Sequence, residues 1–180
     1  MPDQTEIQLQ AAIAALRDVV AQAVDPDDPA AREQLQLVID QLTFIRSRIG
    51  QLDERRRFEI RHHINLVGSL LTAAESVDPS LLVESTAALD QARVLLADPS
   101  ARAEELVHAH ERLGQVVVRI LDTAADAARC DLDRLIVELS GARVTFERAW
   151  YAPLGFDPAP ETLPSVEDLI AIDRLEGLPT

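Results

Sequence analysis

The chain has 180 residues and a formal net charge of −14 at pH 7, with 47% apolar and 27% charged residues, which is typical of a chain that folds in water. All 17 of its Lys and Arg residues are arginines, which excludes chemistry that needs a lysine, such as Schiff-base, P-loop and protein-kinase chemistry. The acidic balance also disfavours nucleic acid and anionic membranes as partners.

The composition favours an all-α fold. Aromatic residues make up 3% of the chain and there are only six glycines, whereas the helix formers Ala, Leu, Gln, Glu and Arg dominate. No apolar run approaches the ~18 to 20 residues that span a bilayer, and the first residues, MPDQTEIQLQ, lack the basic and apolar regions of a secretory signal. The sequence therefore predicts a cytoplasmic protein with no membrane partner.

Three Asp-Pro pairs predict where helices begin, because aspartate is a good N-cap and proline is well tolerated at the first helical position. The pairs are Asp28-Pro29, Asp78-Pro79 and Asp98-Pro99. They predict four helices joined by short loops, which makes consecutive helices antiparallel neighbours. The expected ranges are 3–24, 29–77, 79–97 and 99–140.

The second predicted helix carries a heptad seam, in which residues of one face recur at alternating steps of three and four. If unbroken, this helix is roughly 70 Å long, so the first and third helices together are needed to cover it. The seam consists of Leu35, Val38, Leu42, Ile45, Ile49, Leu52, Arg56, Glu59, His63, Leu66, Leu70 and Ala73. A small shift to Ile60, Ile64, Val67 and Leu71 would leave its polar members on the flank.

The fourth predicted helix overshoots the second, so it either bends, at Gly114, or is covered by another subunit. We expect an elongated antiparallel helical bundle with two long helices that forms a homodimer. A break at Gly50 would instead give a compact bundle of shorter helices.

The chain changes character after Gly141. Four of the six aromatic residues, Phe146, Trp150, Tyr151 and Phe156, lie within eleven residues, and we expect them to close one end of the core. We divide the chain into a helical bundle, 1–151, and a Pro-rich acidic tail, 152–180.

Ser165 begins a short amphipathic helix in this tail, with Asp168 at the capping-box position. Leu169 and Ile172 lie on its apolar edge. The helix either covers its own bundle or presents these two side chains to a partner.

Arginines crowd the middle of the second predicted helix, where Arg46, Arg48, Arg55, Arg56, Arg57 and Arg61 occur. Arg55, Arg57 and Arg61 are candidates for binding an acidic protein surface or a phosphate group. The alternative is internal pairing with Asp53, Glu54, Glu59 and the acidic fourth helix.

All four histidines lie in two clusters, and each cluster follows a glutamate by three residues, as Glu59-x-x-His62 and Glu105-x-x-His108. Di-iron carboxylate bundles present a carboxylate and an imidazole at this spacing. These four residues are therefore candidate ligands for iron or another divalent transition metal. The alternative is that they are ordinary polar positions of the bundle. A dinuclear site also needs a glutamate from each of two further helices, and these two glutamates are missing or misplaced.

Residues 58–67, with the sequence FEIRHHINLV, resemble the H-box helix of histidine-kinase dimerisation and phosphotransfer domains, whose pattern is His-Glu-(Leu/Ile)-Arg-x-Pro-(Leu/Ile)-Asn. The resemblance covers about residues 51–97 and implies a dimeric helical hairpin that binds a signalling partner. Phe58 stands where the family has its phosphorylated histidine, and His63 replaces the family's proline. His62 or His63 is the remaining candidate phosphoryl acceptor.

The sequence thus favours a non-enzymatic interaction protein, an adaptor or regulator, which needs no cofactor and binds another protein, itself, or both. Two alternatives remain open: a metal-binding bundle that uses the two Glu-x-x-His motifs, and a histidine phosphotransfer protein.

Overall fold

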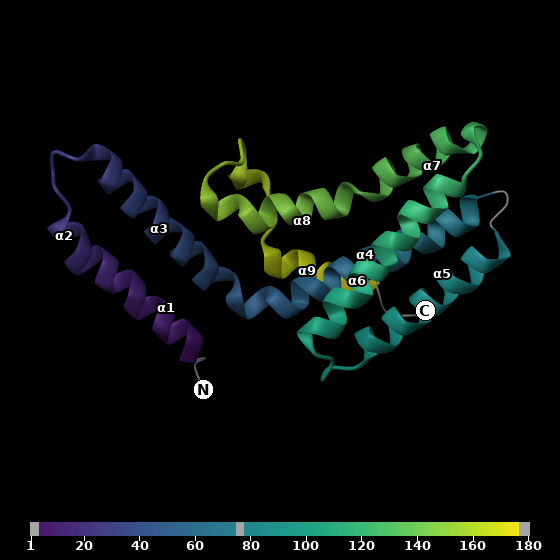
Figure 1. The fold of residues 1–180 in the computed structure, drawn as a ribbon, viewed down its shortest axis with the longest axis horizontal. Coiled ribbons are helices and arrows are strands. Elements are labelled where there is room, and N and C mark those ends of the chain that lie inside the picture. Colours follow the sequence, from purple (N-terminus) through teal and green to yellow (C-terminus); the bar gives the residue numbers. More distant parts are fainter. Residues whose placement is uncertain (1–3, 75–77, 177–180) are drawn as a thin grey trace. The chain divides into compact units, whose positions relative to one another are not determined.

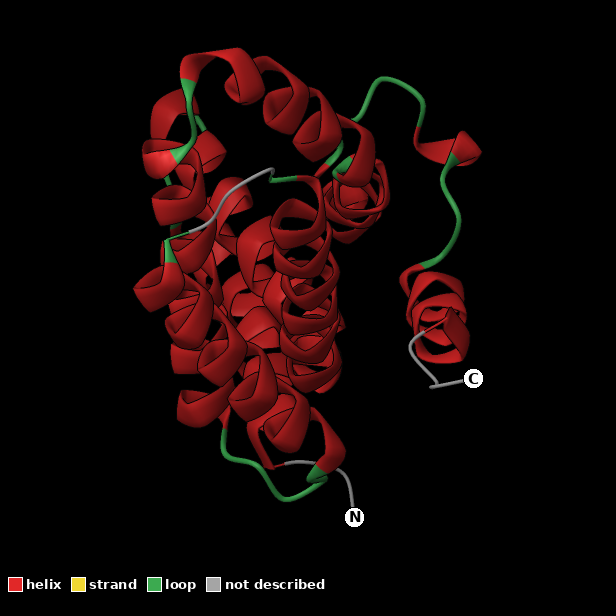
Figure 2. Ribbon diagram, turned by 90° about the vertical axis from the view of Figure 1, so that its right-hand side faces the viewer, coloured by secondary structure: helices red, strands yellow, loops and turns green. Residues whose placement is uncertain are grey.

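The structure of the protein is a computed structural model that describes residues 4–74 and 78–176. The regular secondary structure of these residues is entirely helical, without a strand (Figure 2). They divide into two compact units, which we name the hairpin unit, residues 1–52 with 150–162, and the core unit, residues 53–149 with 163–180. The all-α prediction is confirmed for the described residues.

The hairpin unit is built on two helical segments that pack side by side (Figure 1). The first comprises α1 (Gln4–Ala15), a π-helical segment (Leu16–Val20) and α2 (Ala21–Ala23); the second is α3 (Pro29–Arg48). Asp28 caps α3 as expected, because its carboxylate accepts a hydrogen bond of 3.0 Å from the Ala31 backbone N–H. Short 3-10 turns at Ala152–Leu154 and Pro160–Thr162 complete the unit.

The core unit contains most of the buried apolar residues of the described chain. Its helices are α4 (Leu52–Ala73), α5 (Pro79–Ala97), α6 (Ala103–Thr123), α7 (Asp126–Leu139), α8 (Gly141–Tyr151) and α9 (Val166–Glu176), although Leu52 and the last two residues of α8 count with the hairpin unit. α5 and α6 form a closely packed pair. The core contains Ile60, Val67 and Leu70 of α4, Leu81, Leu89 and Ala92 of α5, Leu106, Leu113, Val116 and Ile120 of α6, and Leu132 of α7.

Neither of the two long predicted helices is continuous. A 3-10 turn, Ile49–Gln51, separates α3 from α4. The second predicted helix is therefore interrupted at Gly50, which the sequence had offered as an alternative to a continuous helix. The expected end of this helix, at residue 77, lies outside the described residues. The fourth helix breaks at Ala124 and Ala125, whose backbones are extended, and Gly114 lies inside α6. The break has a tertiary cause, because it returns Leu132 and the partly buried Leu135 to the core.

Of the three Asp-Pro pairs that were expected to begin helices, two cap a helix and the third does not. Asp78 accepts hydrogen bonds from the backbone N–H groups of Ser80, at 2.8 Å, and Leu81, at 3.3 Å, at the start of α5. A hydrogen bond from the Ser80 hydroxyl, followed by these backbone contacts, lowers the pKa of Asp78. Asp98 instead closes a turn by accepting from the Ser100 N–H at 2.8 Å, and α6 begins only at Ala103. The expected helix start at Pro99 is therefore wrong.

The aromatic residues near the end of α8 do not form one cluster. In the core unit, Phe146 stacks on Phe58 with ring centroids 4.1 Å apart. In the hairpin unit, Tyr151 stacks on Phe44 at 5.7 Å, and the Arg48 guanidinium lies 5.3 Å from the centroid of the Trp150 ring. The ring of Phe156 belongs to neither contact and is 85% exposed. The aromatic residues are thus shared between the two units, because the boundary between the core unit and the hairpin unit falls between Ala149 and Trp150.

Candidate functional site

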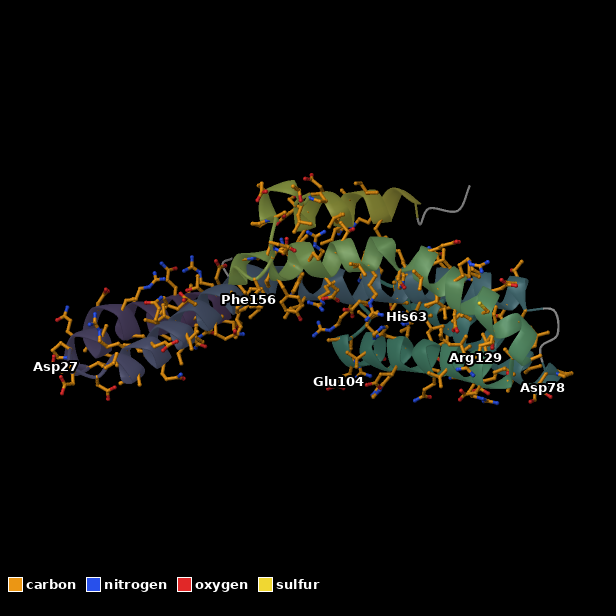
Figure 3. The ribbon with its side chains drawn as sticks, turned by 90° about the horizontal axis from the view of Figure 1, so that it is seen from above. Asp27, His63, Asp78, Glu104, Arg129 and Phe156 are labelled. Atoms are coloured by element: carbon orange, nitrogen blue, oxygen red, sulfur yellow. The ribbon has the colours of Figure 1, made fainter. Side chains whose placement is uncertain are left out.

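The core unit holds a layer of three histidines. His62 and His63, the second of which is labelled in Figure 3, are buried on α4. His63 meets His110 of α6 edge to face, with ring centroids 4.4 Å apart. Nδ1 of His63 lies 2.9 Å from the Glu59 carbonyl oxygen, the partner to which this nitrogen can donate. Nε2 of His110 is buried and has no hydrogen-bond partner among the described residues. The sequence predicted that His62 and His108 act together, whereas the structure brings His63 and His110 together.

Burial keeps His62 and His63 of this layer uncharged. The pKa of His62 is lowered to about 4, first by burial and then by charge repulsion from the neighbouring His63, Arg143 and His110. Burial also lowers the pKa of His63, although the hydrogen bond to Glu59 acts in the opposite direction. At neutral pH both rings are therefore neutral.

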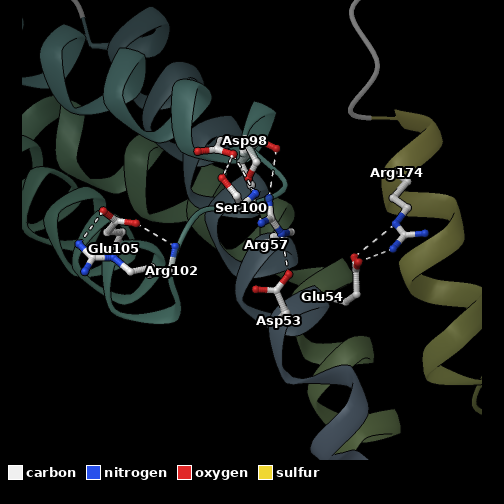
Figure 4. A network of polar contacts seen from close by, with 9 residues as sticks. Asp53, Glu54, Arg57, Asp98, Ser100, Arg102, Glu105 and Arg174 are labelled. Carbon is white, nitrogen blue, oxygen red and sulfur yellow. Dashed lines mark hydrogen bonds and ion pairs between the residues drawn. The ribbon is translucent and has the colours of Figure 1, made fainter. Parts of the chain in front are cut away.

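The four predicted metal ligands do not assemble. The Glu105 carboxylate accepts from the Arg102 backbone N–H at 2.8 Å and from its guanidinium at 3.1 Å (Figure 4), and these hydrogen bonds lower its pKa. The His108 side chain is 79% exposed and lies 3.4 Å from Glu111. The part of the chain that the structure describes contains no group of three His, Cys, Asp or Glu side chains that could hold a metal ion. The motif of α6 fails because its His108 lies off the face that α6 buries.

The predicted phosphoryl acceptors are difficult to reach. His62 is 9% exposed and His63 is 7% exposed, and His110 covers part of the His63 ring. A phosphoryl donor could approach either ring only after α4 separated from the helices that cover it.

Arg55 and Arg61, which were candidates for binding a partner, make internal ion pairs in the core unit. Arg55 contacts Glu59 at 3.0 Å and Glu147 of α8 at 2.9 Å. Arg61 pairs with Asp173 of α9. The pairing with Glu59 is the alternative that the sequence left open, whereas Glu147 and Asp173 were not foreseen because they lie about ninety or more residues away in the chain.

Arg57 is the most deeply buried of the three candidate arginines. Its guanidinium donates to the Asp53 carboxylate at 2.7 Å and to the carbonyl oxygens of Leu96, at 3.2 Å, and Asp98, at 3.1 Å (Figure 4). The side chain thereby ties α4 to the end of α5 and is not available to a partner.

Replacing Arg57 tests this structural role. We expect Arg57→Leu to lower the free energy of unfolding by about 2–4 kcal/mol, because two carbonyl oxygens lose their charged donor. Arg93→Leu is the matched control, since Arg93 and its partner Asp90 are both largely exposed, and we expect a change of less than about 0.5 kcal/mol. Urea unfolding followed by circular dichroism measures both. Equal stability of the two variants would contradict the internal role of Arg57.

The tail helix α9 docks through a different edge from the one predicted. Val166 and Ile170 are buried, Leu169 is half-buried and Ile172 is 50% exposed. The predicted cap is present, since the Asp168 N–H donates to the Ser165 hydroxyl at 3.0 Å and that hydroxyl donates back to the Asp168 carboxylate at 2.7 Å. Of the two predicted contact residues, Ile172 is the more exposed.

In the hairpin unit, one line of the predicted heptad seam remains uncovered. Val38, Ile45 and Leu52 are seven residues apart and are 49%, 39% and 37% exposed. Next to this line, Ile39 is buried and Leu42 is partly buried. The segment that contains α1 therefore covers one edge of the apolar face of α3 and leaves the other edge open.

The helix α1 shows the same excess of uncovered apolar surface. Residues 7–16, with the sequence IQLQAAIAAL, contain no charged side chain. Of these ten residues, only Ile13 is buried, Leu9 and Leu16 are partly buried, and the remaining seven are exposed. Sequence reasoning passed over this stretch, although ten consecutive uncharged residues in a helix already indicate burial on more than one side.

Comparison with known protein families, with curated proteins and with solved structures finds no match to this chain. No helix within the described residues is long and apolar enough to cross a membrane.

Proposed function

We propose that the protein is a non-enzymatic interaction protein, an adaptor or regulator, that binds a helical surface of another chain with its hairpin unit. The observation that carries the proposal is the open line formed by Val38 and Ile45 of α3 and by Leu52 at the start of α4. We name this line together with the exposed side of residues 7–16 the apolar hairpin face.

The burial of the hairpin unit supports this proposal. Within the described residues of this unit, only Ile13, Ile39 and Trp150 are buried. Helices in proteins are stabilised mainly by packing of an apolar face, and a helix that is apolar on all sides belongs in an interior. Two helices that share so small an interior gain stability when a further helical surface covers them.

The other functions that the sequence raised have less support. The candidate metal ligands are engaged elsewhere or exposed, and the candidate phosphoryl acceptors are covered. The elongated bundle that the sequence predicts is part of the present proposal, and the predicted homodimer is one of the complexes that the proposal allows.

A photo-crosslinking amino acid placed at Val38 in the cell of origin tests the proposal. We expect crosslinks to a protein, because Val38 lies on the apolar hairpin face. The same amino acid at Ser47 is the control, since Ser47 is exposed and lies on the opposite, polar side of α3, beside the exposed pair Gln36 and Asp40. Protein crosslinks from position 47 alone, or from neither position, would contradict the proposed function.

A further inference from the structure

We propose that the partner covering the apolar hairpin face is a second copy of this chain, so that two hairpin units form one four-helix bundle. The inference rests on the proposed function and names the partner for the same surface. In this bundle, α1 and α3 of each copy lie around a shared core that contains Val38 and Ile45 of both chains.

The first argument is that the hairpin supplies half of a four-helix bundle. In such a bundle, each helix contacts two neighbours through an apolar stripe wider than a single seam. α3 has this wide stripe, since Ile39 is buried and Leu42 is partly buried within the hairpin unit, while Val38 and Ile45 are left open. A second hairpin of the same kind brings two further helices with matching stripes. A two-fold axis closes such an assembly at two copies.

The second argument is the distribution of charge along the hairpin. Its turn carries Asp25, Asp27 and Asp28, and Asp27 marks this end in Figure 3. The opposite end of α3 carries Arg46 and Arg48. An antiparallel two-fold arrangement places the acidic end of one hairpin beside the arginine end of the other, whereas a parallel arrangement brings six aspartates together. The hairpin is thus complementary to itself in one orientation.

The charge of the hairpin also argues against a membrane as the occupant. Residues 1–52 contain eight acidic residues and four arginines, a net charge of −4. Helices that lie on membranes flank their apolar face with basic residues, which attract anionic lipids. The acidic turn of this hairpin would be repelled by such a surface, whereas the arginine end of a second copy attracts it.

Sedimentation of the purified full-length chain over a wide concentration range tests the proposal. We expect a monomer–dimer equilibrium with the dimer as the largest species. The double variant Val38→Glu/Ile45→Glu should raise the dissociation constant roughly a hundredfold or more, because each substitution buries a charge in the shared core. Val38→Ala/Ile45→Ala, which keeps good helix formers, should raise it roughly tenfold.

Ser47→Glu is the matched control and should leave the dissociation constant unchanged, because its charge projects from the polar side of α3. The alanine variant also separates loss of the interface from loss of the helix, since circular dichroism should show the wild-type helix content. A monomer at every concentration, an open-ended series of larger species, or a glutamate variant that dimerises like the wild type would each overturn the proposal. If the purified chain is monomeric but Val38 crosslinks to a different protein, the second copy is excluded and the proposed function stands.

Discussion

Replacing Phe146 with alanine is expected to produce the largest loss of stability of any single substitution considered for this protein. The Phe146 side chain is fully buried and stacks on Phe58 at 4.1 Å, so its removal leaves a cavity between α4 and α8. Removal of a buried phenylalanine costs about 3–5 kcal/mol, from the lost burial and from the cavity together. Urea unfolding followed by circular dichroism should report a loss of this size in the core unit.

Phe156→Ala is the control for this substitution, because the same side chain is removed from a site that is 85% exposed. Surface substitutions of this kind change stability by less than about 0.5 kcal/mol. If both alanine variants unfolded at the same urea concentration as the wild type, the placement of Phe146 in the core would be contradicted.

Mild acid is expected to destabilise the core unit through its histidine layer. The pKa of His62 is lowered to about 4 in the folded chain, first by burial and then by the charges of His63, Arg143 and His110, and the ordinary value is 6.5. Between these two values the unfolded chain binds more protons than the folded chain, so stability is complete above pH 6.5 and falls as the pH drops toward 4. From pH 7 to pH 5 we expect a loss of about 1–2 kcal/mol, which allows for solvent screening of the partly hydrated ring.

The source of this pH dependence can be assigned with two glutamine variants. His62→Gln removes the ring that the folded chain keeps from binding a proton. The stability of this variant should therefore fall less steeply between pH 7 and pH 5. His108→Gln should keep the wild-type slope, because the His108 side chain is 79% exposed. Urea titrations at several pH values measure these slopes. A flat wild-type profile, or a His62→Gln profile as steep as that of the wild type, would show that the buried layer does not govern the acid response.

Local sequence rules located the helices where the determinants are local. The aspartate caps at residues 28 and 78 and the Ser165–Asp168 cap act over two or three residues, and the structure contains all three. The turn at Ala124 and Ala125 could not be foreseen in this way, because alanine is the best helix former. It forms because the chain reverses there and returns Leu132 to the core, which is a tertiary effect.

The same distinction applies to the candidate site. The i,i+3 spacing correctly places Glu105 and His108 on one side of α6, but the spacing does not reveal whether that side faces the core. In the packed structure, the His108 side chain points to solvent, and His110 lies beside His63 instead. The partners of Arg55 and Arg61 could not be predicted either, since Glu147 and Asp173 approach only through the docking of α8 and α9. The heptad seam of α3 was found from the sequence, whereas only the structure shows which of its lines is open.

Hydrogen–deuterium exchange of the backbone amides of residues 7–16 tests most directly whether the apolar hairpin face is covered in solution. A pair of thinly packed helices opens readily, so its amides exchange fast unless another surface holds the pair closed. We predict that protection of these amides rises with protein concentration in the wild type and is lost in Val38→Glu/Ile45→Glu, while the α6 amides exchange alike in both. Fast exchange of residues 7–16 at every concentration, equal in wild type and variant, would contradict coverage of this face by a second copy.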